Sequence, residues 1–463
     1  MSAIEAIYHR CPIPVQNAMV TAWGAVWYSR RFGRHFYEKV RELEQNEKLT
    51  SEQFAAWQLR SLNAVLEQAA KAPYYRQQFQ EARLTLPLKS LEQLAELPRL
   101  SKQVLRSQPT DLLTTTPPWG TKVLHSSGTT GTPTSIYFTR NFHQEHTAYF
   151  QARHRQWAGI GQRDSRAMFG IRKVCAFEQS RPPFWRKSAA ENMYYYSVYH
   201  LAPAFLPSYV EHLRKFRPKV IMGYPSALNV VARHLLGRGE TIPVQAVLTT
   251  SETVTNQIRA AVEAAFECRL FDQYGCVENT HFVSQCEYGS YHVSPERGII
   301  EILDGDQPCP PGKEGKVVVT GLENQLQPLI RYELGDVSYW AEDQSCPCNR
   351  QMPIMGGISG RVEDYCVTPD GRQILRFDAI FKATSNIVEG QIIQEEADRF
   401  TVRVVPTSAY SVADEERIRA AFRNHAGNAT LDIEMVENIP RTSNGKFRAV
   451  INRSRPSTGV SAS

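Results

Sequence analysis

Ser126-Ser127-Gly128-Thr129-Thr130-Gly131-Thr132-Pro133-Thr134 is the stretch that decides how the rest of this chain is interpreted. Apolar residues precede it at 123–124 and follow it at 136–138, as expected for a loop between two strands. Glycines let the backbone approach a phosphate, and clustered hydroxyls add hydrogen-bond donors. A Walker loop would place a lysine directly after its last glycine, and this stretch has none there. It therefore predicts a phosphate-binding loop of another kind, whose nucleotide-binding residues are Ser126, Ser127, Gly128, Thr129, Thr130 and Gly131.

From about residue 123 to residue 339, short apolar segments alternate with segments of helical periodicity. Strands and helices in that order indicate an α/β layered sheet. After Arg361 the pattern changes to strands around one amphipathic helix, which indicates a small α+β unit. The predicted strands are residues 220–222, 244–249, 374–383, 400–405 and 431–436, and the predicted helices are residues 226–236, 255–265 and 412–424.

The first eighty residues are predicted to be mainly helical. Between Ala55 and Ala69, apolar residues recur at alternating four- and three-residue spacing, and Ala72-Pro73 is a helix stop. The predicted fold class is α/β, with a large multi-layer N-terminal domain and a small, mobile α+β C-terminal lid domain. The expected parts are a helical leader over residues 1–80, a core domain over residues 81–361 and a lid domain over residues 362–463.

Composition excludes some classes of protein. Lys and Arg number 53 against 47 Asp and Glu, and no basic run concentrates the net charge of +6, so nucleic acid is not an expected partner. The nine cysteines are an odd number scattered along the chain, and its start lacks the pattern of a secretory signal. These features favour a reducing compartment, and the predicted location is the cytoplasm.

Residues 11–29 carry no charge, and arginines flank them on both sides. Two prolines and several polar side chains make the stretch too broken for the roughly 20 apolar residues that a bilayer helix needs. Two alternatives remain. The stretch is either a helix in the membrane interface, with Trp23, Val26 and Trp27 on its apolar side, or a helix packed on the protein's own surface. Peripheral membrane contact through the leader stays open, and so does a homodimer.

Four further stretches carry related chemistry: Tyr-Gly-Cys-Val-Glu at 274–278, Arg-Tyr-Glu-Leu-Gly-Asp at 331–336, Gly-Arg-Val-Glu-Asp at 360–364 and Pro-Arg-Thr-Ser-Asn-Gly-Lys at 440–446. Together with the loop at 126–134, they resemble the superfamily of adenylate-forming enzymes. That superfamily includes acyl-CoA synthetases, firefly luciferase and the adenylation domains of peptide synthetases. His125 ahead of the loop and the compact length are similar to its phenylacetate-CoA ligase branch.

The resemblance implies a nucleotide site. Tyr274 would stack on adenine beside Gly275 of the same turn, and Glu278 would hold a magnesium ion, since a hard cation prefers carboxylate oxygen. Asp336 would accept hydrogen bonds from both ribose hydroxyls, and an ionised acceptor facing two donors gives strong, orienting bonds.

The remaining two stretches imply a moving part. Arg361 would contact the ribose or a phosphate, and Glu363 would be the hinge, where the family usually has aspartate; Asp364 is the alternative pivot. Lys446 would stabilise the transition state of adenylation, because an aimed cation lowers the barrier when charge develops on the α-phosphate. Lys446, Glu278 and Arg361 are therefore the predicted catalytic residues.

A second set of residues predicts a metal. Cys286 and His292 precede Cys346-Pro347-Cys348 by about fifty residues. Three thiolates and one imidazole form the closed tetrahedral set that structural zinc uses, and similar positions occur in part of the phenylacetate-CoA ligase branch. Four unrelated buried side chains are the alternative, because neither pair has the two-to-four-residue spacing of zinc knuckles.

The resulting hypothesis is an AMP-forming ligase that uses ATP, Mg²⁺ and coenzyme A and holds a structural Zn²⁺. The family default for its carboxylic acid is an aromatic, phenylacetate-like one, and aromatic residues at 169, 194–196, 199 and 224 suit an aryl pocket. One alternative keeps adenylation but uses an amine or sugar acceptor in polysaccharide biosynthesis, because residues 13–37 resemble relatives found with such enzymes. The other is a non-catalytic nucleotide-binding scaffold, against which intact Lys446, Glu278 and Asp336 argue.

Overall fold

The computed structural model of the chain describes residues 3–125, 134–170, 172–176, 178–358, 360–361, 366–367, 373–374, 378–381, 384, 386–426, 429–441 and 447–454. Contacts divide the chain into two compact units. Unit 1 combines Met1–Tyr28, Gly159–Asp272 and Ser359–Ser463, and unit 2 combines Ser29–Ala158 and Gln273–Ile358. Each unit is assembled from segments distant in sequence, and the division into residues 1–80, 81–361 and 362–463 stays a prediction.

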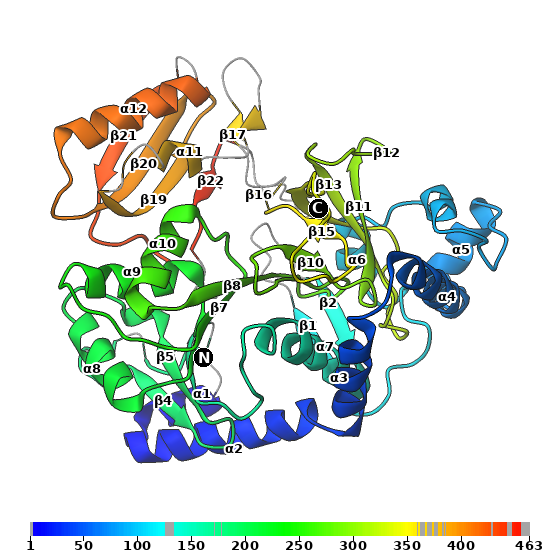
Figure 1. Cartoon of the computed structure of the whole chain (residues 1–463), viewed down its shortest axis with the longest axis horizontal. Helices are drawn as coiled ribbons and strands as arrows, with labels where there is room; N and C mark the ends of the chain where they lie inside the picture. Colours follow the sequence, from blue (N-terminus) through cyan, green and yellow to red (C-terminus); the bar gives the residue numbers. More distant parts are fainter. Residues whose placement is uncertain are drawn as a thin grey trace. The chain divides into compact units, whose positions relative to one another are not determined.

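A mainly parallel sheet is the centre of unit 1, with strand order β8-β7-β6-β3-β5-β4. Figure 1 labels β4, β5, β7 and β8 of this sheet. β3 runs parallel to both β5 and β6, β6 runs parallel to β7, and β4 is antiparallel to β5. All four residues of β6 are buried, as expected for a parallel strand covered on both faces. The elements are β3 (Arg166–Gly170), β4 (Trp185–Ser188), β5 (Met193–Ser197), η3 (Val198–His200), α8 (Leu206–Phe216), β6 (Val220–Gly223), α9 (Pro225–Leu236), β7 (Ala246–Thr250), α10 (Asn256–Phe266) and β8 (Arg269–Tyr274).

Glycine is required where β6 ends. A Cβ atom on Gly223 would lie 2.2 Å from the carbonyl oxygen of Phe169, so any side chain would force β6 away from β3. The Phe169 ring stacks on Tyr196 at 4.6 Å inside the same core. Both rings are therefore packing residues, and the aromatic cluster at 169 and 196 does not line an aryl pocket.

The C-terminal segment of unit 1 forms a second sheet, of order β21-β20-β19-β22, beside one helix. Ile418 and Phe422 of α12 pack in one cluster with Phe400 and Val402 of β20. This arrangement agrees with the predicted small α+β unit. The elements are β16 (Gly360–Arg361), β17 (Cys366–Val367), β18 (Gln373–Ile374), α11 (Asp378–Phe381), β19 (Ile387–Gln394), β20 (Arg399–Pro406), α12 (Val412–Ala426), β21 (Thr430–Met435) and β22 (Val450–Asn452).

The predicted strand over residues 374–383 is wrong. In the described part of this stretch, Gln373–Ile374 is a strand and Asp378–Phe381 is a short helix. Ile380 is fully buried from that helical turn, and the Phe381 ring lies over Gly390 of β19, where a Cβ atom would come within 2.2 Å of it. Ile380, one of the apolar residues that suggested a strand, is therefore buried by a helical turn instead.

Unit 2 consists of antiparallel strands and helices. One sheet has the order β12-β11-β13-β14, and the end of β8 continues through β9 and β10 to β15. β1 and β2 are the two strands expected on either side of residues 126–133, and they pair antiparallel, with Lys122 opposite Phe138. The elements are α3 (Arg34–Asn46), α4 (Ser51–Ala69), α5 (Pro73–Glu81), η1 (Glu92–Glu96), α6 (Lys102–Ser107), β1 (Lys122–His125), β2 (Ser135–Phe138), α7 (Arg140–Tyr149), η2 (Phe150–Arg155), β9 (Val283–Gln285), β10 (Tyr291–Val293), β11 (Gly298–Asp304), β12 (Gln307–Pro308), β13 (Gly315–Gly321), β14 (Tyr332–Ser338) and β15 (Ile354–Met355).

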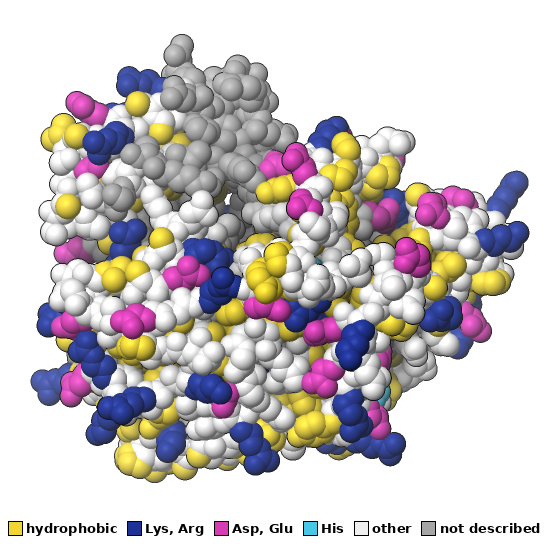
Figure 2. Space-filling view, viewed as in Figure 1, with side chains coloured by type: hydrophobic (Ala, Val, Ile, Leu, Met, Phe, Trp, Pro, Cys, Tyr) yellow, Lys and Arg dark blue, Asp and Glu magenta, His cyan; other side chains and the backbone are white. Residues whose placement is uncertain are grey.

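Among the described residues, no helix combines the length and the apolar character needed to cross a membrane. Two helices begin the chain, α1 (Ala3–Arg10) and α2 (Ile13–Arg31). The α2 helix packs on unit 1: the Arg186 guanidinium donates to Gln16 Oε1 at 2.6 Å, and a Cβ atom on Gly24 would lie 2.4 Å from Ser188 Oγ. Trp23 and Val26 are 46% and 68% exposed, so membrane contact stays a prediction, as does a homodimer. Figure 2 shows acidic and basic side chains interspersed over the visible described surface, in line with the small net charge.

Candidate nucleotide site and cysteine–histidine cluster

Unit 2 brings the predicted adenine and ribose residues together. Tyr274 is the last residue of β8, and Asp336 lies in β14. The Tyr274 hydroxyl donates a hydrogen bond to Asp336 Oδ2 at 2.9 Å, and the aspartate is buried. Gly275 follows Tyr274 directly, so the turn begins at this contact.

Glu278 lies on the same turn and is also buried. Its Oε1 accepts a hydrogen bond of 2.9 Å from the hydroxyl of Tyr332. Burial first, and the Glu278 charge second, raise the pKa of Tyr332 above its ordinary value, so the phenol remains a donor. Tyr332 and Asp336 both lie in β14, and they contact the 274–278 turn through Glu278 and Tyr274. Sequence analysis missed the role of Tyr332, because its partner Glu278 is 54 positions away.

Two neutral side chains complete this turn. Burial and the Glu278 charge raise the pKa of Cys276 to about 12, so its thiol stays protonated at neutral pH and is a poor nucleophile. Burial, together with the charge of Arg297, lowers the pKa of His281 to about 3, and its ring lies 4.6 Å from the Tyr274 ring. The charge of the turn therefore belongs to its carboxylates, which suit hydroxyl groups and a hard cation.

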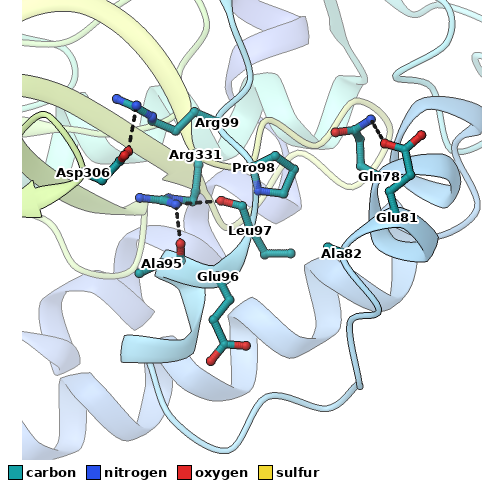
Figure 3. Close-up of a pocket in the computed structure, with 10 residues that line it drawn as sticks. All are labelled: Gln78, Glu81, Ala82, Ala95, Glu96, Leu97, Pro98, Arg99, Asp306 and Arg331. Atoms are coloured by element: carbon teal, nitrogen blue, oxygen red, sulfur yellow. Dashed lines mark hydrogen bonds and ion pairs between the residues drawn. The ribbon is translucent and has the colours of Figure 1, made fainter.

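Arg331, which opens the 331–336 stretch, has a structural role. Its guanidinium donates to both carboxylate oxygens of Glu301, and also to the carbonyls of Ala95 at 2.7 Å and Leu97 at 2.6 Å. It lines a pocket of about 470 Å³ in unit 2, in which Arg99 pairs with Asp306 (Figure 3). The pocket contains none of the predicted site residues; its lining is Gln78, Glu81, Ala82, Ala95, Glu96, Leu97, Pro98, Arg99, Asp306 and Arg331.

Several predicted site residues cannot be placed. Arg361 lies in β16, but its side chain is not among those described. Two stretches that carry predicted site residues, 126–133 and 442–446, lie outside the described part of the chain. β1 and β2 lie on either side of the first stretch, and Arg441 and Phe447 lie on either side of the second. The residues outside the described part are Ser126, Ser127, Gly128, Thr129, Thr130, Gly131, Glu363 and Lys446.

The predicted zinc ligands lie together in unit 2. One ligand atom from each of Cys286, His292, Cys346 and Cys348 falls within 4.8 Å of all the others. The sulfur atoms of Cys286 and Cys346 are 3.7 Å apart, and Cys348 Sγ is 3.2 Å from His292 Nε2. The other ring nitrogen, His292 Nδ1, lies 3.2 Å from the carbonyl of Met352, which can accept a hydrogen bond from Nδ1–H and so favour the tautomer in which Nε2 keeps its lone pair.

Three features define a nucleotide-binding enzyme of the adenylate-forming class. They are the mainly parallel α/β sheet, the small C-terminal α+β unit, and the buried carboxylates of Asp336 and Glu278, which accept hydrogen bonds from Tyr274 and Tyr332. The chain belongs to the AMP-binding enzyme family, which matches residues 64–325, more than half of its length. Residues 366–453 match the CapK C-terminal domain.

Named relatives support the assignment of this chain to the AMP-binding enzymes. The chain is 24% identical to Protein CapK of Staphylococcus aureus, covering 97% of this chain and 99% of the relative. It is 24% identical to phenylacetate-coenzyme A ligase of Thermus thermophilus, covering 82% and 92%. The crystal structure of 2-hydroxyisobutyryl-CoA ligase with 2-HIB-AMP, in the postadenylation state, has a TM-score of 0.70 at 22% identity, covering 88% of this chain and 91% of that one. The predicted superfamily, its phenylacetate-CoA ligase-like branch and the α/β fold class are confirmed.

Proposed function

We propose that this chain is an AMP-forming carboxylate–CoA ligase, which activates a carboxylic acid as an acyl-adenylate and transfers the acyl group to coenzyme A. Membership of the AMP-binding enzymes supports an acid–CoA ligase type of enzyme. The observation that carries the proposal is the buried turn in which Tyr274 holds Asp336 and Tyr332 holds Glu278. Two carboxylates fixed by phenols suit a ribose and a cation, because a buried charge is costly unless it meets such partners.

In this proposal, Asp336 accepts the ribose hydroxyls and the Tyr274 ring faces the adenine. The Glu278 carboxylate fits Mg²⁺, because a hard cation prefers such oxygens and Tyr332 leaves the second oxygen to other partners. When bound, Mg²⁺ would neutralise charge on the phosphates. Lys446 and Arg361 are the proposed cations at the reacting phosphate, Glu363 is the proposed hinge, and residues 126–131 form the proposed phosphate loop.

The proposed acid is an aromatic one, as in the relatives named phenylacetate-coenzyme A ligase. Because Phe169, Tyr196 and Tyr224 are buried in one core cluster, support from this chain comes from Tyr199, which is partly buried and follows β5. Ligands of open α/β sheets bind outside the carboxyl ends of the strands, where Tyr199 lies. A panel of free acids, assayed by pyrophosphate release, tests this choice. Release with aliphatic acids alone would overturn the aromatic class, and silence with every acid would favour the scaffold.

An amine or sugar acceptor, in polysaccharide biosynthesis, is the second candidate. It is favoured by the match of residues 366–453 to the CapK C-terminal domain and by coverage of 97% with Protein CapK, against 82% with the Thermus ligase. Mass spectrometry of the product after addition of coenzyme A or of amines separates the two candidates. A thioester supports the ligase, and an amide with no thioester supports the alternative.

From the distances within the cysteine–histidine cluster, we also assign a structural zinc ion to Cys286, His292, Cys346 and Cys348. Tetrahedral zinc, with bonds of about 2.3 Å to sulfur and 2.0–2.1 Å to nitrogen, holds two sulfurs about 3.8 Å apart and a sulfur and a nitrogen about 3.6 Å apart. The separations of 3.7 Å and 3.2 Å are close to these values. Four protein ligands leave no open position for substrate, so the ion would be structural. The proposed cytoplasmic location is consistent with thiols that stay reduced.

A further inference from the structure

Described residues of unit 1 hold both ends of the segment 442–446. On one side, Arg441 forms a buried ion pair with Glu389 of β19. On the other side, the backbone N–H of Phe447 donates to Glu252 Oε1 at 2.7 Å. The Arg441 guanidinium also lies 5.0 Å from the centre of the Phe447 ring, a cation–π distance that joins the two ends.

Glu252 is itself fixed by the core of unit 1. It follows β7 after Ser251, whose φ of 73° is a left-handed conformation that a non-glycine residue rarely adopts. Its second oxygen, Oε2, accepts the backbone N–H of Ser226 at 3.0 Å, in the first turn of α9. An ionised acceptor at a helix N-terminus makes a strong and well-directed bond. The carboxylate therefore links the start of α9 directly to the N–H of Phe447.

Other contacts between the core helices and the C-terminal segment meet a different part of it. Asn229 of α9 donates to the carbonyl of Val388 at 3.1 Å, and Gln257 of α10 donates to the carbonyl of Thr384 at 3.3 Å. These bonds hold the region around the start of β19. The Glu252 bond instead joins the core to the backbone of Phe447, the residue directly after Lys446.

We propose that Glu252 is a positioning residue for adenylation, which fixes the backbone beside Lys446 by accepting the Phe447 N–H. This inference rests on the proposed function, in which Lys446 stabilises the adenylation transition state. Displacement of a catalytic group by about 1 Å can cost a hundredfold in rate, so a backbone anchor next to the lysine has a kinetic effect. Glu252 itself exchanges no proton with the substrate.

The test separates the two half-reactions. Glu252→Ala should lower the rate of pyrophosphate release about 10- to 100-fold, the range expected when a hydrogen bond to a charged group is lost. The ATP Michaelis constant and thiolation from supplied acyl-adenylate should stay near wild type. Glu252→Gln should recover part of the rate, because its amide oxygen still accepts one N–H. Glu263→Gln is the matched control, since Glu263 also accepts a backbone N–H in unit 1, from Leu270 at 2.9 Å.

A double-mutant cycle with Lys446→Ala distinguishes positioning from general structural damage. If Glu252 acts through Lys446, adding Glu252→Ala to Lys446→Ala should cause no further loss of adenylation. If the rate losses of the two single variants multiply in the double variant, or if Glu252→Ala slows both half-reactions equally, the positioning role is overturned. If Lys446→Ala impairs adenylation but Glu252→Ala does not, only this inference fails. If Lys446→Ala leaves adenylation intact, the proposed role of Lys446 fails, and this inference fails with it.

Discussion

Tyr274 and Asp336 are 62 residues apart in sequence, yet the hydroxyl of one donates to the carboxylate of the other at 2.9 Å. The bond orients the carboxylate before a nucleotide arrives, and it fixes the phenol ring against the same strand. The positions of the proposed adenine and ribose contacts are therefore coupled, so a change in one residue displaces the other.

The first prediction concerns this pair. Asp336→Ala should raise the ATP Michaelis constant about tenfold or more, because each hydrogen bond to a charged group contributes roughly 1.5 to 3 kcal/mol. Tyr274→Phe keeps the ring and should cause a smaller increase. Coenzyme A affinity should change in neither variant. Asp304→Ala is the control, since Asp304 is paired with Lys313 on the exposed part of β11. An unchanged constant for Asp336→Ala would exclude the ribose role.

The second prediction concerns Lys446. Lys446→Ala should slow adenylation about a hundredfold or more, the loss typical of a transition-state contact of roughly 3 kcal/mol. Thiolation from supplied acyl-adenylate should survive much better, and single-turnover assays of each half-reaction measure both. Lys313→Ala, which removes an exposed ammonium group, should leave both rates unchanged. Equal loss in the two half-reactions would contradict an assignment to the first step.

The third prediction concerns the metal. Elemental analysis of purified protein should find about one zinc per chain, and Cys346→Ser combined with Cys348→Ser should remove most of it. Thermal stability should fall before activity does, because the closed ligand set touches no substrate. Cys11→Ser, outside the cluster, should retain the metal. Metal-free protein with normal stability and activity would show that the four residues share no ion.

The fourth prediction is acid destabilisation by buried histidines. Burial lowers the pKa of His143, His154 and His281 to about 3, whereas an unfolded histidine titrates near 6.5. Between these values the unfolded chain binds more protons, so stability is complete above about pH 6.5 and falls as the pH drops. Each histidine should contribute roughly 1.4 kcal/mol per pH unit in that window. Proton uptake on unfolding at pH 5, measured by calorimetry in two buffers, should include about three protons from this set.

A matched pair of variants tests the assignment. His154→Gln should remove about one proton from that uptake. Ser284→Ala deletes the hydroxyl 2.9 Å from His154 Nδ1 but keeps the buried imidazole, so it should lower stability while leaving the uptake unchanged. Equal uptake by wild type and His154→Gln would rule out burial of a neutral imidazole.

Local periodicity explains the part of the fold that the sequence predicted. The strand expected at 220–222 is Val220–Gly223, and the helix expected at 412–424 is Val412–Ala426. The strand depends on a short continuous apolar run and the helix on a period of 3.6 residues, and both patterns lie within one segment. The failure at 374–383 has the same origin, because a short apolar run does not reveal whether Ile380 will be buried by a strand or by a helical turn.

For the candidate site, the sequence predicted individual residues but not the contacts between them. Motif resemblance selected Tyr274, Glu278 and Asp336, but their contacts depend on pairing across the fold. Tyr332 escaped notice because nothing near it in sequence shows that it meets Glu278, 54 positions away. Glu252 escaped for the same reason, since its partner Phe447 is 195 positions away.

The cysteine–histidine cluster also bears on how the chain folds. Cys286 and Cys346 are separated by 60 positions, and β11 to β14, including Asp336, lie between them. An ion held by both residues would close a loop around that sheet and would reduce the conformational freedom of the unfolded chain. For a covalent cross-link of this span, the loop-entropy estimate is about 4 kcal/mol. Zinc bound before the sheet forms would therefore reduce the number of pairing registers open to β14. Refolding in a chelator should be slower than refolding with zinc.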